Sequence, residues 1–279
     1  MNRKQKINLR KGIRAGVQIL FLVLAPGLFV AAFSGIKNTF TQIGAGEALT
    51  MTPFLKMLIL LCAFTILFGR FFCGYACPFG ALGDLVSFIS KFVQKKVKKK
   101  LPKIPDKAMS ILRYVKYAVL AAILAMCVMG IYSDISSYSP WEPFSQIVAL
   151  KFTKALEYKV GLAILVVLMI GMLFQERFFC QIFCPLGAIF SLLPVLPFSI
   201  LKRDRESCIN GCSACKRNCP VSLDIDGDSS RSGECFSCGK CTDICPKENI
   251  RTEIIGKTGF EWYSIAIKAI LLLALQAVL

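Results

Sequence analysis

The chain has 279 residues, of which 55% are hydrophobic and 18% are charged. A soluble domain carries about 25% charged residues, so this composition predicts a protein that lies in lipid. Lys and Arg outnumber Asp and Glu by 34 to 17, an excess that in a membrane protein indicates topology, and nucleic acid is therefore not an expected partner. The complete lack of histidine excludes bis-His haem, His-containing zinc sites and histidine proton relays. Fourteen cysteines then leave disulfides or thiolate-bound metal as the alternatives.

Five apolar runs predict membrane-spanning helices, each of spanning length or close to it. They cover residues 15–33, 54–72, 111–132, 160–174 and 262–279. The fifth has an alternative, because Lys268 lies near its middle and is expensive in hydrocarbon. In that alternative, residues 262–279 form a helix that lies against the bundle or against a partner subunit.

The lysines and arginines predict the orientation of these helices. Residues 3–14 hold six Lys or Arg, and residues 91–107 hold eight. By the positive-inside rule both segments are cytoplasmic, and alternation returns residues 202–257 to the same side. The sequence therefore predicts a multi-pass protein of the cytoplasmic (inner) membrane, with lipid as a partner and its cysteine-rich segment facing the cytoplasm.

An internal repeat lies at the cytoplasmic ends of two predicted helices. The segment Arg70-Phe71-Phe72-Cys73-x3-Cys77-Pro78 recurs as Arg177-Phe178-Phe179-Cys180-x3-Cys184-Pro185. Both copies end an inward-running helix, so we expect two parallel two-helix repeats related by an axis along the membrane normal. Each proline is expected to begin a following helix, where its missing N–H is tolerated.

The cytoplasmic segment contains two four-cysteine sets. The second, Cys235-x2-Cys238-x2-Cys241-x3-Cys245-Pro246, has the spacing of bacterial [4Fe-4S] ferredoxins. The first is Cys208-x3-Cys212-x2-Cys215-x3-Cys219-Pro220. By the crossed ligation of two-cluster ferredoxins, we expect Cys208, Cys212, Cys215 and Cys245 to hold one cluster, and Cys219, Cys235, Cys238 and Cys241 to hold the other.

The first set departs from the usual spacing by one residue between Cys208 and Cys212, and Gly211 is expected to take up the extra length in a turn. The alternative for both sets is structural zinc held by four thiolates. Zinc does not account for two sets that each end in Cys-Pro, and disulfides are disfavoured in a reducing cytosol.

The repeated Cys-x3-Cys-Pro motifs have three interpretations. The first is that Cys73, Cys77, Cys180 and Cys184 together bind one further redox metal centre, iron-sulfur or copper, because cysteines four apart share a helix face and thiolates select soft metals. The others are a redox-active thiol pair and purely structural cysteines. The arginines before each pair, Arg70 and Arg177, either offset the charge of a thiolate cluster or end their helices at the headgroups. Cys62 and Cys127 have no partner motif and are predicted to pack in the core.

The predicted fold is thus mainly α: a polytopic transmembrane helical bundle of two parallel two-helix repeats and a fifth span, with a small cytoplasmic two-cluster ferredoxin-like α+β insertion. Residues 1–107 form the first repeat with its basic loop, and residues 108–201 form the second repeat. Residues 202–257 form the ferredoxin domain, and residues 258–279 form the last helix.

These motifs together resemble a known family. The doubled Cys-x3-Cys-Pro motif followed by two ferredoxin-type cysteine sets is similar to NapH, the membrane ferredoxin subunit of periplasmic nitrate reductase systems. The membrane polyferredoxins NosR and CcoG share these motifs. The resemblance covers about residues 10–255. It implies that the eight ferredoxin cysteines, and the four cysteines of the repeated motif, bind redox centres.

The resemblance implies a one-electron relay between the quinone pool or a cytosolic donor and a partner redox protein. It implies two [4Fe-4S] clusters as cofactors, and it makes quinone a candidate ligand in a quinol-oxidising complex. No residue is assigned a catalytic role. Two alternatives stay open: a copper or cofactor reductase, or maturation factor, for a respiratory enzyme, as in CcoG, and a redox sensor whose interactions change when a cluster is lost.

Overall fold

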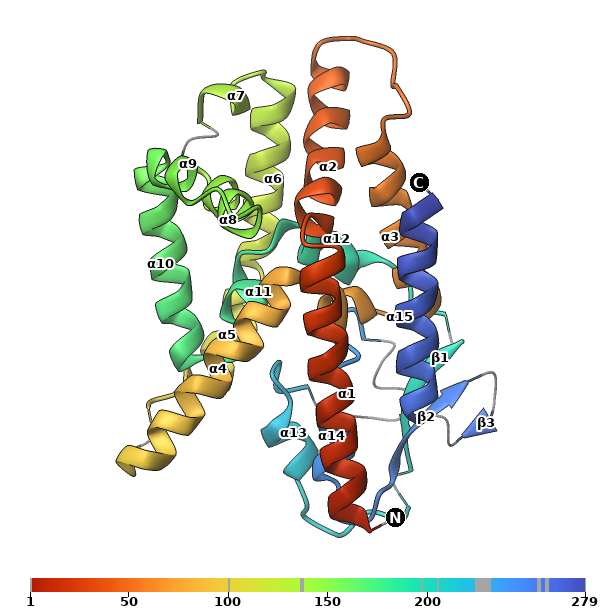
Figure 1. Ribbon diagram of the computed structural model, residues 1–279. Helices are drawn as coiled ribbons and strands as arrows, with labels where there is room; N and C mark the ends of the chain where they lie inside the picture. Colours follow the sequence, from red (N-terminus) through yellow and green to blue (C-terminus); the bar gives the residue numbers. More distant parts are fainter. Residues whose placement is uncertain are drawn as a thin grey trace. The chain divides into compact units, whose positions relative to one another are not determined.

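The computed structural model describes residues 2–99, 101–135, 138–196, 198–204, 206–223, 232–254, 257–258 and 261–278 (Figure 1). The chain is mainly helical, with one small antiparallel sheet. It divides into two compact units that are each built from separate stretches of the chain. The first unit comprises Met1–Leu24, Leu60–Cys77 and Ile189–Val278, and the second comprises Ala25–Ile59 and Pro78–Ala188.

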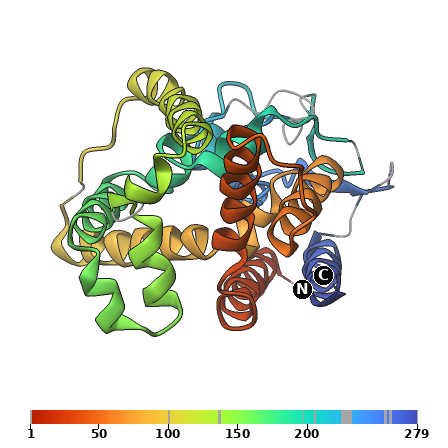
Figure 2. The same cartoon turned by 90° about the horizontal axis from the view of Figure 1, so that it is seen from above.

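The first unit is built around two long helices and the cysteine-rich segment. Helix α1 (Arg3–Leu24) and helix α15 (Glu261–Val278) lie side by side (Figures 1 and 2). The C-terminal part of α3 (Pro53–Phe68) and the π-helix η1 (Phe72–Ala76) belong to the same unit, and η1 packs against α1.

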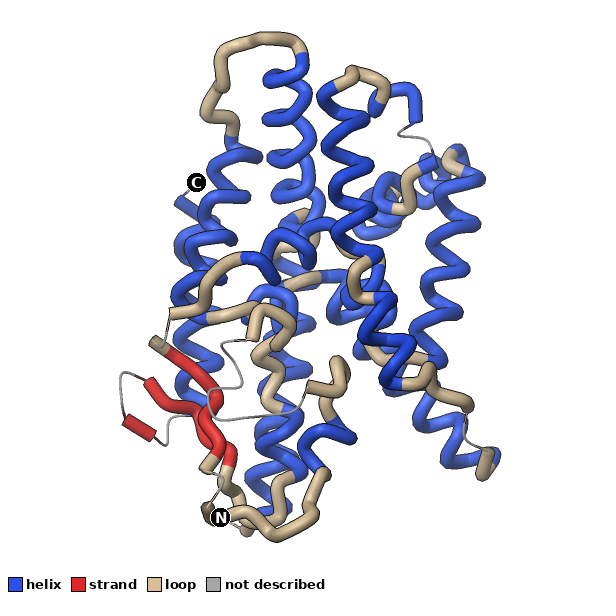
Figure 3. Tube along the Cα trace, turned by 180° about the vertical axis from the view of Figure 1, so that it is seen from behind, coloured by secondary structure: helices blue, strands red, loops and turns tan. Residues whose placement is uncertain are grey.

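The strands of the first unit lie before and after the cysteine-rich segment in the sequence. Strand β1 (Ser199–Arg203) pairs antiparallel with β2 (Ile250–Ile254), and β2 pairs with the short β3 (Lys257–Thr258) (Figure 3). Between β1 and β2 lie two short helices that pack on each other, α13 (Ala214–Asn218) and α14 (Lys240–Ile244). Each of these helices is followed at once by a Cys-Pro in extended conformation, at Cys219 and Cys245. The two halves of the segment therefore have the same local form.

The second unit contains the remaining helices, which enclose an aromatic core. They are α2 (Leu28–Gly44), α4 (Pro78–Val97), α5 (Asp106–Leu112), α6 (Val115–Val128), α7 (Tyr132–Ile135), α8 (Trp141–Val148), α9 (Phe152–Glu157), α10 (Lys159–Phe174) and α11 (Phe178–Ile182). Helix α12 (Pro185–Leu192) begins in this unit and continues into the first. Phe79 is fully buried, and its ring centroid lies 3.6 Å from that of Phe144 and 4.5 Å from that of Phe179.

The prediction of a polytopic transmembrane bundle is wrong. Among the described residues, one helical segment, Asp106–Val128, is long and apolar enough to cross a membrane by length and composition. Arg3–Leu24 and Leu28–Gly44 meet the same criteria only if the broken pair is taken as a single span. The apolar helices Pro53–Phe68, Lys159–Phe174 and Tyr263–Val278 are shorter.

Chain breaks explain why the apolar runs do not become full spans. A 16-residue helix such as α3 rises about 24 Å at 1.5 Å per residue, less than the hydrocarbon thickness of about 30 Å. Helix α3 ends because Gly69 adopts a left-handed conformation, with φ of 67°, which is a common helix stop. The first apolar run is interrupted after α1 by Ala25-Pro26-Gly27.

In both copies of the repeat, a new helix begins at the proline of Cys-Pro, as predicted. Helix α4 begins at Pro78 and α12 begins at Pro185, so each proline occupies a first helical position. The segments before them differ, because Cys73 lies in a π-helix whereas Cys180 lies in an α-helix. Of the two cysteines without a motif, Cys127 is buried in α6 as predicted, whereas Cys62 in α3 is partly exposed.

The arginine of the second copy is a fully buried cation. Arg177 has no exposed side-chain surface and adopts a left-handed backbone conformation with φ of 57°, which is uncommon outside glycine. Its guanidinium binds Asp84 of α4 through two hydrogen bonds, Nε to Oδ1 at 3.2 Å and Nη2 to Oδ2 at 2.6 Å. This bidentate pair fixes the turn before Cys180 onto α4.

We expect Asp84→Asn to destabilise the protein strongly. The substitution removes the charge that compensates a buried guanidinium, and breaking a buried pair in this way costs about 3–5 kcal/mol. Denaturant unfolding in detergent, followed by circular dichroism, measures the change. The matched control is Lys91→Ala, which removes the more exposed ion pair with Glu176 and should cost about 0–1 kcal/mol. Equal losses in the two variants would contradict the role assigned to Asp84.

Candidate iron-sulfur sites

Four thiols line a first cavity in the cysteine-rich segment. They are those of Cys208, Cys212, Cys215 and Cys245, and Arg203, Asn249 and Ile250 complete the wall. Gly211 adopts a left-handed conformation with φ of 74°, so it makes the predicted turn between the first two cysteines. Arg203 Nε donates to Cys208 Sγ at 3.2 Å, and the backbone N–H of Asn249 donates to Cys245 Sγ at 3.4 Å.

Four other thiols line a second cavity. They are those of Cys219, Cys235, Cys238 and Cys241, with Leu201, Val221 and Phe236 as apolar neighbours. Cys219 therefore lies with the three cysteines that follow it by sixteen or more residues, and Cys245 lies with the three that precede it. These groups are the two crossed sets expected from the spacing. Their role as ligands stays a prediction.

A small buried cluster connects the two cavities. It contains Cys215 and Cys245 from the first cavity, Cys241 from the second, and Leu201 and Ile250 from the two paired strands. All fourteen cysteines are free thiols. In the part of the chain that the structure describes, no three His, Cys, Asp or Glu side chains form a group that could hold a single metal ion.

The electrostatics of the second cavity disfavour free thiolates. Loss of hydration, together with the nearby Cys238 and Cys219, raises the pKa of Cys235 to about 12, whereas Arg70 opposes the shift. Loss of hydration also raises the pKa of Cys241, to which Cys238, Cys235 and Cys219 add. These thiols therefore need a bound metal cation to deprotonate together, which is how thiolate sites couple metal binding to proton release.

The first cavity has one thiol that ionises more readily. The hydrogen bond from Arg203 lowers the pKa of Cys208, and Asn249 contributes in the same direction. The donor set of both cavities, four cysteine sulfurs each, fits an iron-sulfur cluster, and N–H groups that point at sulfur are the interactions that tune such centres.

Helix α1 reaches both cysteine sets through its arginines. Arg3 Nη2 donates to the carbonyl oxygen of Cys245 at 2.7 Å, and Arg14 Nη1 donates to that of Cys238 at 3.0 Å. Arg10, which lies on the same helix face, pairs with Asp243 of α14 at 2.8 Å. The basic N-terminal segment, which was interpreted from sequence as an orientation signal, thus holds the cysteine loops in the first unit.

The first Cys-x3-Cys-Pro motif also contacts the second cavity. A Cβ atom added at Gly74 would lie only 2.4 Å from the carbonyl oxygen of Phe236, which sits between Cys235 and Cys238 in sequence. Tyr75 lies next to this point, and its hydroxyl donates to the carbonyl oxygen of Cys238 at 3.4 Å. Only glycine permits so close an approach of η1 to the cysteine loop.

Arg70 of the same motif is buried against this loop. Its side chain is 1% exposed, and its Nη1 donates to the carbonyl oxygen of Gly233 at 3.1 Å and lies 3.7 Å from Glu234. Its guanidinium stands 4.7 Å above the ring of Phe236. The charge of this cation also opposes the rise in the pKa of Cys235. The prediction that Arg70 offsets thiolate charge is therefore favoured over a role at lipid headgroups.

The four cysteines of the repeated motif are all buried, with 5–6% exposure. Cys73 and Cys77 belong to the first unit, and Cys180 and Cys184 belong to the second. Cys184 directly precedes α12, and its sulfur accepts a hydrogen bond from the backbone N–H of Gly187 at 3.2 Å.

A 4Fe-4S binding domain matches residues 50–100 and 159–202. YccM of Escherichia coli, named as a candidate electron transport protein, is 29% identical over 79% of this chain and 59% of its own length. The regulatory protein NosR of Stutzerimonas stutzeri is 28% identical over 91% of this chain and 35% of its own length. The ferredoxin-type protein NapH of Haemophilus influenzae is 24% identical over 68% of this chain and 64% of its own length. No solved structure matches the chain.

The predicted resemblance to NapH-type proteins is confirmed. Iron-sulfur electron transport is accordingly the class of function to which the relatives of this chain point. The 4Fe-4S domain matches twice, once over each Cys-x3-Cys-Pro copy, and the eight ferredoxin cysteines lie outside the matched residues. The chain spans between about a third and two thirds of the length of these three relatives.

The NapH-type resemblance did not identify several residues that build the sites. Arg203 and Asn249 contact sulfur, Arg3 and Arg14 hold the cysteine loops, and Gly74 permits the approach of η1. One signal was available in the sequence: Arg3, Arg10 and Arg14 recur at seven and four residues, which places them on one helix face. Their partners could not be inferred from spacing, since they lie more than 220 residues away.

We expect Gly74→Ala to destabilise the first unit and to disturb the second cavity. The added methyl group meets a backbone carbonyl, and overpacking of this kind costs about 1–3 kcal/mol. Because that carbonyl belongs to Phe236, iron bound near Cys235 and Cys238 should fall. Unfolding by denaturant and iron analysis measure the two effects.

The control is Gly12→Ala, on the exposed surface of α1, where no atom lies within 4 Å of the new Cβ. That variant should gain up to about 1 kcal/mol from helix propensity. If Gly74→Ala keeps parental stability and iron, the close approach of η1 has no consequence and the prediction is wrong.

Proposed function

We propose that this chain is a membrane-associated iron-sulfur relay that holds two [4Fe-4S] clusters in the two thiol-lined cavities. The observation that carries the proposal is that each cavity collects four cysteines in the crossed pattern of a two-cluster ferredoxin. Structural zinc would need four thiolates at each site as well, but it gives no reason for crossed sets that share one buried cluster of residues.

The clusters supply reversible one-electron transfer when bound. The protein contributes the surroundings. Arg203 and the N–H of Asn249 donate to sulfur at the first cavity, and Arg14 and Arg70 bring positive charge close to the second. Hydrogen-bond donors and cations near thiolate sulfur stabilise the reduced, more negatively charged state of an iron-sulfur centre. Leu201 and Ile250 pack in one buried cluster with Cys215 and Cys245 of the first cavity and Cys241 of the second.

The relay is proposed to work at the cytoplasmic side of a membrane. Asp106–Val128 is the segment proposed to enter the bilayer, and the lysine-rich residues 91–107, which run into its first turn, favour a cytoplasmic start. Electrons would pass between the quinone pool or a cytosolic donor and a partner redox protein. The ferredoxin-type relative NapH supports the role of an electron carrier, and a carrier needs a partner redox protein to exchange its electrons with.

A further redox centre is proposed at the repeated motifs, with Cys73, Cys77, Cys180 and Cys184 as its thiolates. Support comes from the repeated sequence and from the 4Fe-4S domain, which matches over both copies. Iron-sulfur is favoured over copper for the same reason. Burial of all four cysteines and the N–H donor to Cys184 are consistent with thiolates kept from solvent.

The crossed assignment is tested by single Cys→Ser variants of the anaerobically purified protein. We expect Cys219→Ser and Cys238→Ser to alter the same EPR signal of the reduced protein, and Cys245→Ser to alter the other. Cys62→Ser, which removes a thiol that has no motif, is the matched control and should leave both signals unchanged. If Cys219→Ser instead changes the signal that Cys208→Ser changes, ligation is local and the crossed proposal is wrong. A preparation with zinc and no iron would contradict the relay itself.

The proposed third centre has its own test. Two cubane clusters account for about eight irons, so a further iron-sulfur centre raises the iron content above that value and a copper centre adds copper. The quadruple variant Cys73/Cys77/Cys180/Cys184→Ser should lose only the excess metal and keep both ferredoxin signals. Unchanged metal content in that variant would remove the proposed centre and leave the two-cluster relay standing.

A further inference from the structure

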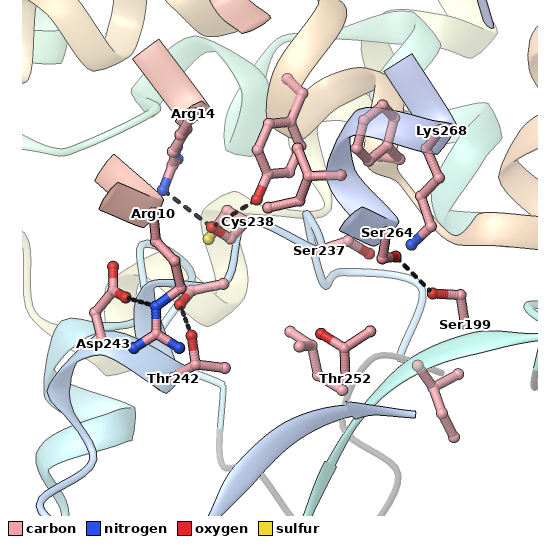
Figure 4. A pocket seen from close by; sticks show the side chains of 16 residues that line it. Arg10, Arg14, Ser199, Ser237, Cys238, Thr242, Asp243, Thr252, Ser264 and Lys268 are labelled. Atoms are coloured by element: carbon pink, nitrogen blue, oxygen red, sulfur yellow. Dashed lines mark hydrogen bonds and ion pairs between the residues drawn. The ribbon is translucent and has the colours of Figure 1, made fainter. Parts of the chain in front are cut away.

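A third cavity of the first unit has a mixed wall, in which basic and hydroxyl side chains lie beside apolar ones and one cysteine, Cys238. It lies among α1, α15, η1 and the paired strands, and its volume is about 50 Å³ (Figure 4). One water needs roughly 10–15 Å³ by this measure, so the space fits a small ion and not a ring system. Three cations, Arg10, Arg14 and Lys268, line it together with the hydroxyls of Ser199, Ser237 and Ser264.

Lys268 is a buried cation that points into this cavity. It is 8% exposed, and Figure 4 shows its ammonium directed toward Ser264 and Ser199. Its Nζ lies 5.7 Å from the ring centroid of Phe68 and 5.7 Å from that of Phe71. Within the described part of the chain, no carboxylate pairs with it, since Asp243 on the cavity wall is engaged by Arg10 at 2.8 Å. A buried ammonium without a counter-charge is costly unless an anion joins it.

The hydroxyl groups supply hydrogen-bond donors next to this charge. Ser199 Oγ and Ser264 Oγ lie 3.5 Å apart, one on β1 and the other on α15. Ser237 Oγ is buried and makes no hydrogen bond to the residues that the structure describes. Each hydroxyl can rotate its proton toward an acceptor in the cavity. Burial also lowers the pKa of Lys268 to about 8, a shift that a bound anion would oppose.

We infer that this cavity binds a small oxyanion of the phosphate class, with Lys268 as its charged partner and Ser199, Ser237 and Ser264 as donors. Three cations against the one carboxylate of Asp243 leave the wall positive. Two sources carry this chemistry: free inorganic phosphate and the phosphate of a phospholipid headgroup. A lipid source has support in the exposed apolar face of α15, where Ile267 and Ile270 are 62% and 67% exposed. The cavity shares Cys238 with the second thiol-lined cavity, so iron content is measured together with anion binding.

The test is isothermal titration calorimetry of the full-length, iron-loaded protein in detergent at constant ionic strength. One arm uses inorganic phosphate and the other uses dihexanoylphosphatidylglycerol as a short-chain lipid. We expect one ligand to bind the parent protein, and Lys268→Met to weaken that binding at least tenfold. Lys95→Met, which removes an exposed lysine of α4, is the matched control and should bind as the parent does.

A second variant keeps the inference testable if Lys268→Met does not fold. Ser199→Ala/Ser264→Ala removes two donors without changing charge and should also weaken binding several-fold. Binding of phosphate alone identifies a free anion, and binding of the lipid alone identifies a headgroup site. The inference fails if neither ligand binds the parent, or if both variants bind with parental affinity. Iron content measured on the same samples distinguishes this failure from failure of the proposed relay.

Discussion

The antiparallel pairing of β1 with β2 is the constraint on which both thiol-lined cavities depend. Arg203 is paired with Ile250, so the chain five residues before Cys208 is fixed beside the chain five residues after Cys245. Once these ends are joined, Cys245 meets the first set, and Cys219 meets the second. Leu201 and Ile250 extend from the sheet into the buried cluster that contains cysteines of both cavities. A short two-strand ladder thus closes a loop of more than forty residues, at an entropic cost that grows only slowly with length.

The thiols gathered in this way repel one another when they are ionised. Nearby arginines offset that repulsion with positive charge. Arg203 and Arg3 lie at the first set, and Arg14 and Arg70 lie at the second. The chain has an excess of 17 positive charges. The positions of these four arginines give part of that excess a local purpose. Arg3 and Arg14 bind backbone carbonyl oxygens, so they hold the cysteine loops in place as well as adding positive charge near them.

The sequence was most informative where chemistry is local. The cysteine spacing and the turn at Gly211 are local features, and the crossed pattern was predicted from the ligation of two-cluster ferredoxins. The structure brings those thiols together as expected. Apolar runs were less informative, because hydropathy averages over a break such as Pro26 or a stop such as Gly69. The predicted bundle failed at those residues. Contacts of α1 with the cysteine loops were not predictable, since nothing in a row of arginines specifies a carbonyl more than 220 residues away.

The repeat illustrates how similar sequence leads to different contacts. Both copies carry Arg, two Cys and Pro at the same spacing, and in both the proline begins a helix. Between the cysteines the first copy has Gly74, whereas the second has Gln181, whose amide binds the carbonyl of Glu176 at 2.7 Å. The glycine lets the first copy touch the cysteine loop, and its arginine then faces Phe236 and Cys235. The arginine of the second copy is instead neutralised by Asp84. Of the two arginines of the repeat, Arg70 therefore lies in the unit that holds the ferredoxin thiols, where its charge opposes the rise in the pKa of Cys235.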